Sequence, residues 1–414
     1  MRLLIAWASG GNWGHVSRQL ALARHAEAWS ADVVWAVPAR KVAALPAVRE
    51  RGYRILACRN VEPPLSAPQA TPRCYADILL GMGFGNEAVL EAQVTAWLNV
   101  FARVKPDRVL IDYAPAAQLA ALLAGLPTVQ VTNGFDSPPA ECPPYEGQVR
   151  GPYLRQHAAA QVQKVERAMQ AVAHKLAPQR HTSLPALIDY PQRLFDCVPE
   201  SDPYAEQRDM RTQRIAYVGP LGEAPAASPP NWPAGHRSAP RVFAYLRGTR
   251  PHVRTALEAL SLLGADVLCV WPDVSDDMLA TLRYLPRLHM TRQPVHIQTA
   301  LAQAQAVLNY GSSTVVAQTI LSGKPQLMLP TDHEKLMVSA QVARNGLGGV
   351  CTERESGAEV QRLAQKLLMD AQTAQAARTV AARHVHLPDQ AATAIREALG
   401  GAAHHSAERR LAEH

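Results

Sequence analysis

The sequence predicts an α/β protein with two Rossmann-like, doubly wound parallel-sheet domains that face each other across a cleft. Three observations support this fold class. Short apolar segments alternate with helical patterns between residues 3 and 132, the same alternation returns between residues 242 and 345, and a proline-rich stretch separates the two parts. Strands that alternate with helices at this spacing form βαβ units, and βαβ units build parallel sheets.

Each half of the chain contains five expected strands and four expected helices. The first-half strands are expected at Leu3–Ala8, Asp32–Val37, Tyr53–Ala57, Arg108–Ile111 and Thr128–Thr132, with helices at His15–Trp29, Lys41–Arg51, Glu87–Val104 and Ala116–Ala124. The second-half strands are expected at Val242–Leu246, Asp266–Val270, Leu288–Thr291, Ala306–Asn309 and Gln326–Leu329, with helices at His252–Leu263, Ile297–Gln303, Thr314–Leu321 and Lys335–Asn345. A helical tail follows from about Ala358.

The proline-rich stretch predicts the domain boundary. Five prolines between residues 223 and 240 exclude a regular element and favour an extended linker. We therefore expect an N-terminal domain at 1–222, a linker at 223–240, and a C-terminal domain at 241–414 that includes the tail. Two more proline-rich stretches, Glu62–Pro72 and Ser137–Pro152, follow first-half strands, where ligands bind in open α/β sheets. Surface loops without a function are the alternative.

The composition excludes several classes of protein. The 414 residues are 48% apolar, which indicates a globular chain and not a disordered one. Six scattered cysteines without a CxxC pair argue against a disulfide scaffold or a structural zinc site, and they fit a reducing cytosol. The apolar segment before Gly10 is too short for a signal peptide, and no later run predicts a membrane span. The net charge of +7 is too diffuse for a nucleic-acid partner, but it suits an anionic substrate or transient contact with an anionic membrane.

A glycine-rich turn follows the first expected strand, with the sequence Ser9-Gly10-Gly11-Asn12-Trp13-Gly14-His15. It lacks the Lys-Ser/Thr of a P-loop and the spacing of the dinucleotide fingerprint, so bound NAD is not expected. Arg40 after the second strand leaves NADP open. A helix N-terminus and burial both favour a neutral imidazole at His15, which suits a general base. The alternative is a histidine that only hydrogen-bonds the turn.

Asp112 ends the expected strand that follows Lys105-Pro106-Asp107. In a doubly wound sheet this strand end lies at the same edge as the glycine-rich turn. An aspartate there can orient His15 and stabilise its imidazolium. The alternative is an aspartate that caps the helix beginning near Ala114.

The second half contains a small polar turn, Gly311-Ser312-Ser313-Thr314, between a strand and a helix. Its backbone N–H groups and hydroxyls form an anion site at a helix N-terminus, suited to a diphosphate without a metal. A plain Ser/Thr N-cap is the alternative.

Together these motifs resemble those of the GT-B glycosyltransferases, most closely the UDP-glycosyltransferase superfamily and its bacterial relatives, which include the lipid-linked GlcNAc transferase of peptidoglycan synthesis. The resemblance spans nearly the whole chain. Besides the segments quoted above, it rests on Gly14-His15, Gly323-Lys324-Pro325, Pro330, Glu334-Lys335 and Gly346-Leu347-Gly348.

The resemblance implies an inverting, metal-independent hexosyltransferase that uses a UDP or dTDP sugar. It places the acceptor on the N-terminal domain and the donor on the C-terminal domain. Its catalytic pair carries over to His15 and Asp112, and the acceptor-side loop carries over to Gly11, Asn12, Trp13 and Gly14. Its donor-binding residues carry over to Gly248, Thr249, Val295, Gly311, Ser312, Ser313, Thr314, Gln318, Glu334 and Lys335. The nucleotide sugar is a co-substrate, so no resident cofactor or metal is expected.

The remaining expectations concern partners and alternatives. The acceptor is expected to be a small molecule, a lipid or a glycan, and the protein a cytoplasmic monomer or homodimer, with peripheral contact at the inner membrane if the acceptor is a lipid. The sequence departs from the family at Asn309-Tyr310, where His-Gly is usual, near Gln318, where a ribose-binding glutamate is usual, and at Lys335, where glutamine is usual. A GT-B epimerase and a non-catalytic nucleotide-sugar or glycan-binding subunit therefore stay open as alternatives.

Overall fold

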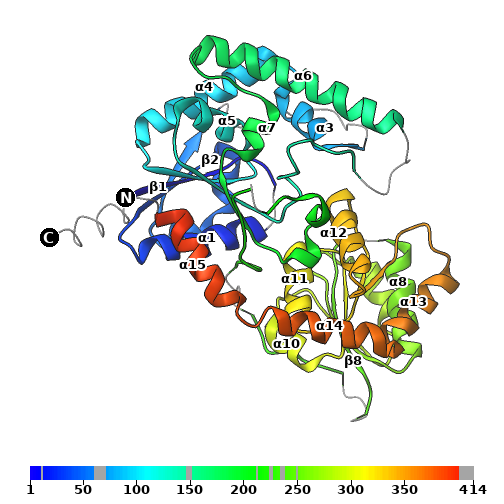
Figure 1. Cartoon of the computed structure of the whole chain (residues 1–414). Helices are drawn as coiled ribbons and strands as arrows, with labels where there is room; N and C mark the ends of the chain where they lie inside the picture. The colour runs from blue at the N-terminus through cyan, green and yellow to red at the C-terminus, as the bar shows by residue number, and fades with distance from the viewer. Residues whose placement is uncertain are drawn as a thin grey trace. The chain divides into compact units, whose positions relative to one another are not determined.

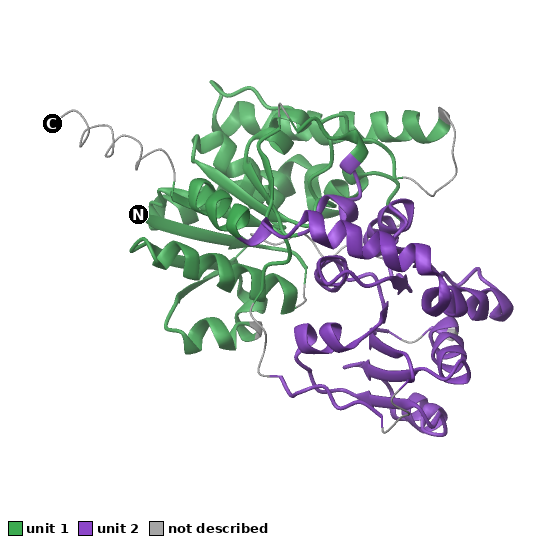
Figure 2. Ribbon diagram, turned by 60° about the horizontal axis from the view of Figure 1, so that its bottom comes forward, with its two compact units in different colours: residues 1–196, 206–223, 389–414 green, residues 197–205, 224–388 purple. Residues whose placement is uncertain are grey.

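The computed structural model describes residues 1–10, 13–59, 71–145, 152–210, 213–222, 227–233, 238–248 and 250–400. Contacts between residues divide the chain into two units (Figure 2). Unit 1 comprises residues 1–196, 206–223 and 389–414, and unit 2 comprises residues 197–205 and 224–388. The sequence-based division differs at two places, because residues 197–205 pack with unit 2 and most of the C-terminal helix packs with unit 1.

Unit 1 is built on a seven-stranded sheet in which every described strand pair is parallel (Figure 1). The strand order is β3-β2-β1-β4-β5-β6-β7. The strands are β1 (Arg2–Trp7), β2 (Asp32–Pro38), β3 (Arg54–Cys58), β4 (Arg108–Asp112), β5 (Thr128–Thr132), β6 (Gln192–Phe195) and β7 (Ile215–Tyr217). Almost every residue of β1, β4 and β5 is buried, as expected for parallel strands covered on both faces.

The helices of unit 1 cover both faces of this sheet. They are α1 (Trp13–Glu27), α2 (Pro46–Glu50), α3 (Tyr75–Leu79), α4 (Glu87–Val104), α5 (Pro115–Ala124), α6 (Pro152–Leu176), α7 (Leu184–Asp189) and α15 (Leu387–Gly400). Shorter turns of helix are η1 (Ala39–Ala44), η2 (Leu80–Phe84) and η4 (Ala205–Gln207), of which the last begins in unit 2. The helix expected at Lys41–Arg51 is thus two short pieces, because Pro46 begins a new helix at a position where its missing N–H costs nothing.

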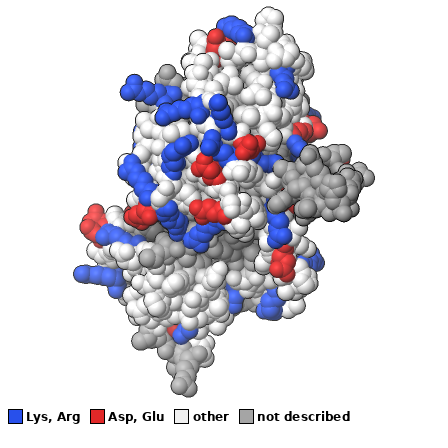
Figure 3. Space-filling model, turned by 90° about the vertical axis from the view of Figure 1, so that its left-hand side faces the viewer, with Lys and Arg blue, Asp and Glu red and all other residues white. Residues whose placement is uncertain are grey.

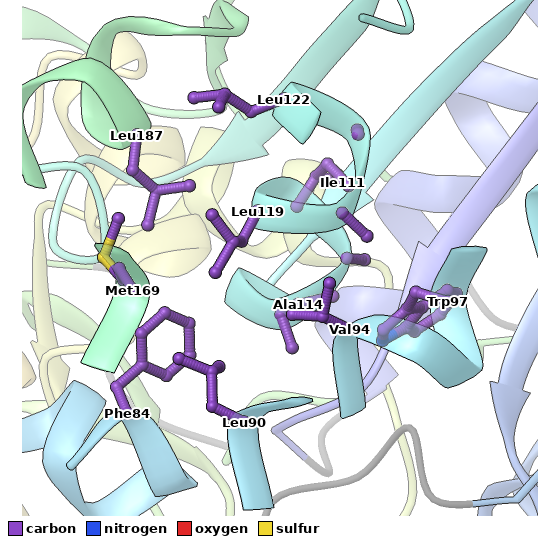
Figure 4. Packing of buried hydrophobic residues seen from close by; sticks show 14 of the residues in the cluster. Phe84, Leu90, Val94, Trp97, Ile111, Ala114, Leu119, Leu122, Met169 and Leu187 are labelled. Carbon is purple, nitrogen blue, oxygen red and sulfur yellow. The ribbon is translucent and has the colours of Figure 1, made fainter. Parts of the chain in front are cut away.

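Two apolar clusters, one on each face, hold unit 1 together. Figure 4 shows part of the first, where Leu90, Val94 and Trp97 of α4 pack near Leu119 of α5 and Ile111 of β4. The second cluster joins α1, the opposite face of β1 and β2, and Ile395, Ala398 and Leu399 of α15. The C-terminal helix therefore closes the apolar surface of the N-terminal sheet.

Unit 2 repeats the architecture with a six-stranded parallel sheet in the order β10-β9-β8-β11-β12-β13. Its strands are β8 (Arg241–Tyr245), β9 (Asp266–Val270), β10 (Leu288–Thr291), β11 (Ala306–Asn309), β12 (Gln326–Met328) and β13 (Gly348–Val350). Its helices are α8 (Pro251–Leu262), α9 (Asp276–Leu282), α10 (Ile297–Gln303), α11 (Ser313–Leu321), α12 (His333–Arg344), α13 (Gly357–Met369) and α14 (Ala371–Arg383), with a turn η3 (Pro199–Ser201).

The described part of the proline-rich stretch belongs to unit 2. Ser228 forms a parallel bridge with Val295, and its carbonyl accepts a hydrogen bond from the backbone N–H of His296 at 2.9 Å. The Trp232 indole donates to Gln303 at 2.6 Å. This segment is extended, as the prolines predict, and it is anchored to the sheet by these contacts.

Candidate active site

Each sheet reverses its strand order at one point, and the predicted functional residues lie at these two points. In unit 1 the reversal falls between β1 and β4, and in unit 2 it falls between β8 and β11. His15 follows β1, and Asp112 ends β4 beside Trp7 of β1 in the strand register. Gly311 follows β11, and Gly248 follows β8. Ligands of doubly wound sheets bind at such switch points, at the carboxyl ends of the strands.

The structure brings the two predicted catalytic residues together. His15 lies in the first turn of α1, and its Nδ1 is 2.8 Å from Oδ1 of Asp112. The Asp112 side chain is fully buried, while 18% of the His15 side chain is exposed. A carboxylate only accepts hydrogen bonds, so Nδ1 carries the hydrogen and Nε2 has the free lone pair. This arrangement suits a base that is oriented by an acid.

Arg18, one turn further along α1, is the main counter-charge of Asp112. Its Nε donates to Oδ2 of Asp112 at 3.0 Å, and its NH2 group donates to Oδ1. Its NH1 group donates to Asp196, which follows β6, at 3.1 Å. Burial raises the pKa of Asp112, but the charges of Arg18 and His15 outweigh burial and hold that pKa well below its usual range. Asp112 is therefore ionised at every pH at which the protein works.

Gln19 completes the shell around Asp112. Its amide donates to Oδ2 of Asp112 at 2.7 Å and its oxygen accepts from the Trp35 indole at 3.0 Å. His15, Arg18 and Gln19 stand at positions i, i+3 and i+4 of one helix, so all three side chains share the helix face that covers the end of β4. One helix thus supplies every side chain that hydrogen-bonds Asp112 among the described residues.

The His15 ring is held between aromatic and backbone groups. It stacks on Trp7 at a ring distance of 5.7 Å and lies parallel to Tyr113 at 6.4 Å. Gly10 has a φ of 74°, and a methyl group added to it would lie 2.3 Å from Nε2 of His15. Glycine is therefore required at this position both by the backbone and by the imidazole. Lys41 donates to the Gly10 carbonyl and lies over the Trp7 ring.

The remaining acceptor-side residues are placed in part. Trp13 and Gly14 begin α1, and the Trp13 side chain is 41% exposed beside the catalytic pair. Gly11 and Asn12 lie outside the described residues. An exposed tryptophan two residues from His15 is a suitable contact for an apolar acceptor.

In unit 2 the turn between β11 and α11 has the backbone that the sequence predicts. Gly311 has a φ of 82°, and its N–H donates to the side chain of Asn309 at 2.8 Å. A methyl group at Gly311 would lie 2.9 Å from Oγ of Ser339 and 3.0 Å from Cβ of Lys335, so α12 packs closely under the turn. Ser312 precedes α11 without capping it, since its hydroxyl lies against the Tyr310 phenol. The N–H groups of Ser313 and Thr314 therefore begin a helix whose N-terminus attracts anions.

Two cationic side chains flank this turn. The Lys335 ammonium lies 5.8 Å from the centre of the Tyr310 ring, and Arg247 is close enough to act on the Tyr310 hydroxyl electrostatically. Burial lowers the pKa of Lys335, but the neighbouring carboxylates Glu334 and Asp332 outweigh burial and raise it. Lys335 is therefore a fixed positive charge at neutral pH.

The other predicted donor residues lie around the same sheet edge or further from it. The Gly248 N–H donates to Asp273 at 3.1 Å, and Glu334 lies in the first turn of α12, which Asp332 caps. Gln318 lies one turn into α11, and its Oε1 is buried without a hydrogen-bond partner among the described residues. Val295 is buried in an apolar cluster below α10. Thr249 lies outside the described residues.

Asn309, one of the two places where the family histidine is expected, has a structural role. It is fully buried at the end of β11, where its amide donates to Gln326 of β12 at 2.9 Å and its oxygen accepts from Gly311. Tyr310 takes the exposed place on the turn, beside Lys335. The side chain that faces a ligand here is therefore a tyrosine with a lysine next to it.

Charge and hydrophobicity over the described surface agree with a globular enzyme. On the face in Figure 3, Lys and Arg side chains are interspersed with Asp and Glu among the described residues. Among those same residues, no helix is both long and apolar enough to cross a membrane.

Comparisons with known proteins give the class. No family model matches the sequence. A rhamnosyltransferase of PGL/p-HBAD biosynthesis from Mycobacterium tuberculosis is 25% identical over 309 residues, which cover 70% of this chain and 67% of the relative. The calicheamicin glycosyltransferase CalG4 superposes with a TM-score of 0.71 at 20% identity, covering 97% of this chain and 99% of that chain. The Streptomyces sp. SF2575 glycosyltransferase SsfS6, complexed with thymidine diphosphate, has a TM-score of 0.60 at 20% identity, covering 95% and 98%.

The fold is therefore GT-B, and the chain is placed among the glycosyltransferases. The sequence-based fold class of two Rossmann-like parallel-sheet domains is confirmed. The relation to the lipid-linked GlcNAc transferase stays a prediction.

Proposed function

We propose that the protein is an inverting, metal-independent hexosyltransferase, which moves a sugar from a nucleoside diphosphate to an acceptor hydroxyl. The observation that carries this proposal is the His15–Asp112 pair at the switch point of unit 1, with Nδ1 on the carboxylate and Nε2 available as a base. In the reaction, Nε2 of His15 accepts the proton of the acceptor hydroxyl while that oxygen bonds to the anomeric carbon. The bond from this carbon to the diphosphate breaks, and the nucleoside diphosphate leaves with the electron pair.

Asp112 and Arg18 have different parts in this step. Asp112 stabilises the imidazolium that forms, because its carboxylate accepts the Nδ1–H bond. Arg18 neither touches the acceptor in this scheme nor moves a proton. It offsets the cost of burying Asp112 and fixes the carboxylate at two oxygens, so Arg18 is a positioning residue.

The donor is proposed to bind unit 2 with its diphosphate at the Gly311–Thr314 turn. The start of α11 and the charge of Lys335 stabilise the negative charge of the leaving diphosphate. Lys335 thereby supplies the cation that the family takes from histidine at this turn. The Gly248 and Thr249 loop is proposed to contact the phosphates from the other side of the switch point, Glu334 the sugar hydroxyls, Gln318 the ribose, and the segment around Val295 the base.

The donor class follows from the relatives. The mycobacterial relative is a rhamnosyltransferase, and the Streptomyces relative was solved with thymidine diphosphate. We therefore propose a dTDP- or UDP-activated hexose as donor and a small-molecule or lipid hydroxyl as acceptor.

A two-stage experiment tests the proposed function. Thermal-shift titration with TDP, UDP, GDP and NAD first selects the nucleotide, and TDP or UDP should raise the melting temperature while NAD does not. The selected nucleotide sugars are then incubated with a panel of phenolic and alcoholic acceptors. NMR of the product should show an anomeric configuration opposite to that of the donor. Retention of configuration would contradict the inverting step, and tight nucleotide binding with neither transfer nor hydrolysis would favour the non-catalytic alternative.

Replacing Lys335 with glutamine, the usual family residue, should weaken the donor. Removing the ammonium beside the Gly311 turn is expected to raise the dissociation constant of TDP or UDP roughly tenfold, because a charge-assisted contact is lost. Isothermal titration measures the change. Lys366→Gln is the matched control, because this exposed lysine pairs with Asp370 on α13 and should leave the affinity unchanged. Tighter nucleotide binding by Lys335→Gln would show that the lysine opposes the donor.

Added magnesium or manganese should not change the rate. The start of α11 and Lys335 replace the cation that metal-dependent transferases place on the diphosphate. Initial rates are measured with and without Mg²⁺ or Mn²⁺ at saturating donor. A rate that rises steeply with either ion would contradict the metal-independent mechanism.

A further inference from the structure

A second cluster of ligating side chains lies in unit 1, away from His15. It comprises Cys74, Asp77 and His157, and it is the one group of this kind among the described residues. One ligand atom from each residue lies within 4.8 Å of the others. Cys74 directly precedes α3, Asp77 lies in the first turn of α3, and His157 comes from α6. The three residues are far apart in sequence, and α3 and α6 pack against each other to bring them together.

The contacts within the cluster fix its polar atoms. Nε2 of His157 lies 3.0 Å from both carboxylate oxygens of Asp77. One of these oxygens also accepts from the backbone N–H groups of Arg73 at 2.8 Å and Cys74 at 3.3 Å, which orient the carboxylate toward His157. About a fifth of the His157 side chain is exposed, whereas Cys74 is fully buried. Water therefore reaches the cluster from the α6 side only through its rim.

A fourth ligating group, Cys142, contacts the same cluster. Its thiol hydrogen-bonds the sulfur of Cys74, and its own sulfur accepts from the backbone N–H groups of Tyr75 and Ala76. The hydrogen bond to Cys74 and these N–H groups lower the pKa of Cys142, although burial acts in the opposite direction. A lowered thiol pKa is typical of cysteines that bind metals as thiolates. Cys142 is 2% exposed, so its thiolate would be shielded from solvent oxidants.

We propose that Cys74, Asp77, Cys142 and His157 bind one zinc ion in a structural, tetrahedral site. Two thiolates, an imidazole nitrogen and a carboxylate oxygen are donors that zinc takes in proteins. Zinc–sulfur bonds of about 2.3 Å place two sulfurs about 3.8 Å apart in a tetrahedron, which is the separation of hydrogen-bonded thiols. The ion takes the place of the proton between His157 and Asp77, and both thiol protons are released on binding.

The site would connect three separate segments of unit 1. Cys74 and Pro144 already form an antiparallel bridge, and the Tyr145 N–H donates to the Arg73 carbonyl at 2.7 Å. Zinc adds a covalent-strength link between this pair of segments and α6. Cys74 lies just after the Glu62–Pro72 stretch and Cys142 lies within Ser137–Pro152, the two stretches expected to contact the acceptor. The inference stands on the cluster alone and does not depend on the transferase mechanism.

Metal content of the purified full chain tests the proposal. The protein is produced in zinc-supplemented medium, purified without chelators, and measured by inductively coupled plasma mass spectrometry. About one zinc per chain is expected for the wild type. His157→Ala and Cys74→Ser should both lose it, and both should melt at a lower temperature. The matched controls are His174→Ala, an exposed histidine of α6, and Cys58→Ser, a hydrogen-bonded cysteine of β3. Both controls should retain the zinc.

Cobalt substitution gives a second readout that does not rely on the stability of the cysteine variant. Cobalt(II) bound by thiolates produces a sulfur-to-metal charge-transfer absorption in the near ultraviolet, which is expected in the wild type and in His174→Ala and weakened in His157→Ala. Wild-type protein without zinc, or equal zinc in wild type and His157→Ala, would overturn the proposal. A Cys74–Cys142 disulfide in the metal-free protein, found by mass spectrometry after alkylation without reduction, would also overturn it.

Discussion

His15→Ala should lose roughly 100- to 10,000-fold in turnover while it keeps its affinity for the donor nucleotide. The loss follows from the removal of Nε2, the proton acceptor that Asp112 and Trp7 hold in place. Donor affinity should persist because the proposed diphosphate turn belongs to unit 2. Turnover is measured with saturating donor and acceptor, and affinity is measured by isothermal titration.

The control for this variant is His25→Ala, on the same helix. His25 is half-buried near the end of α1, and burial lowers its pKa, but no contact joins it to Asp112 in the structure among the described residues. Its turnover should match that of the wild type within a factor of two. Unchanged turnover in His15→Ala would remove His15 from the mechanism.

Arg18→Met should destabilise unit 1 by about 3–5 kcal/mol, the cost of leaving a buried carboxylate without its counter-charge. Asp112 is fully buried and Asp196 is nearly so, and both lose their hydrogen bonds to the guanidinium. Urea unfolding followed by a unit 1 tryptophan signal measures the loss. Arg24→Met, exposed on the same helix, should change the free energy of unfolding by no more than about 0.5 kcal/mol.

The pH dependence of this variant has a definite sign. In the wild type the pKa of Asp112 is depressed, so its contribution to stability is present above about pH 4 and is lost as the pH falls toward the folded-state pKa. In Arg18→Met burial acts without the main opposing charge, so the folded state favours protonated Asp112. The difference in stability between the two proteins should therefore narrow as the pH falls below about 4. A constant difference would show that Arg18 acts through packing and not through charge.

The sequence was sufficient to predict the parts of this molecule that follow from local patterns. Buried parallel strands such as Asp266–Val270 are continuous apolar runs, and the expected and observed limits coincide. The position of His15 and Asp112 followed from one rule, that the ends of parallel strands share an edge of the sheet. Their contact at 2.8 Å agrees with that rule.

Features that depend on tertiary contacts were beyond local patterns. Arg18 and Gln19 look like the polar face of a solvated helix in the sequence, yet both are buried because Asp112 needs their donors. The His-x-x-Arg-Gln spacing was the available signal, since i+3 and i+4 share a face with His15. The long helix α6 and the strands β6 and β7 gave no sequence-based prediction, although β6 carries Asp196 to Arg18.

The cysteine cluster illustrates the same limit. The absence of a CxxC pair argued against a zinc site, because structural zinc ligands often come in close pairs. Here only Cys74 and Asp77 are near in sequence, and Cys142 and His157 arrive through the packing of α6 and the 139–145 segment. Spacing in the sequence does not reveal ligands that the fold assembles from separate segments.

The dependence of the His15→Ala defect on the acidity of the acceptor tests the central claim most directly. An alkyl alcohol needs a base to lose its proton, whereas a nitrophenol is already largely ionised at neutral pH. Rates for the wild type and His15→Ala are compared on one acceptor of each kind at saturating donor. Our account predicts a loss of at least 100-fold with the alcohol and a loss of only a few-fold with the nitrophenol. Equal losses with both acceptors would contradict a general-base role for His15.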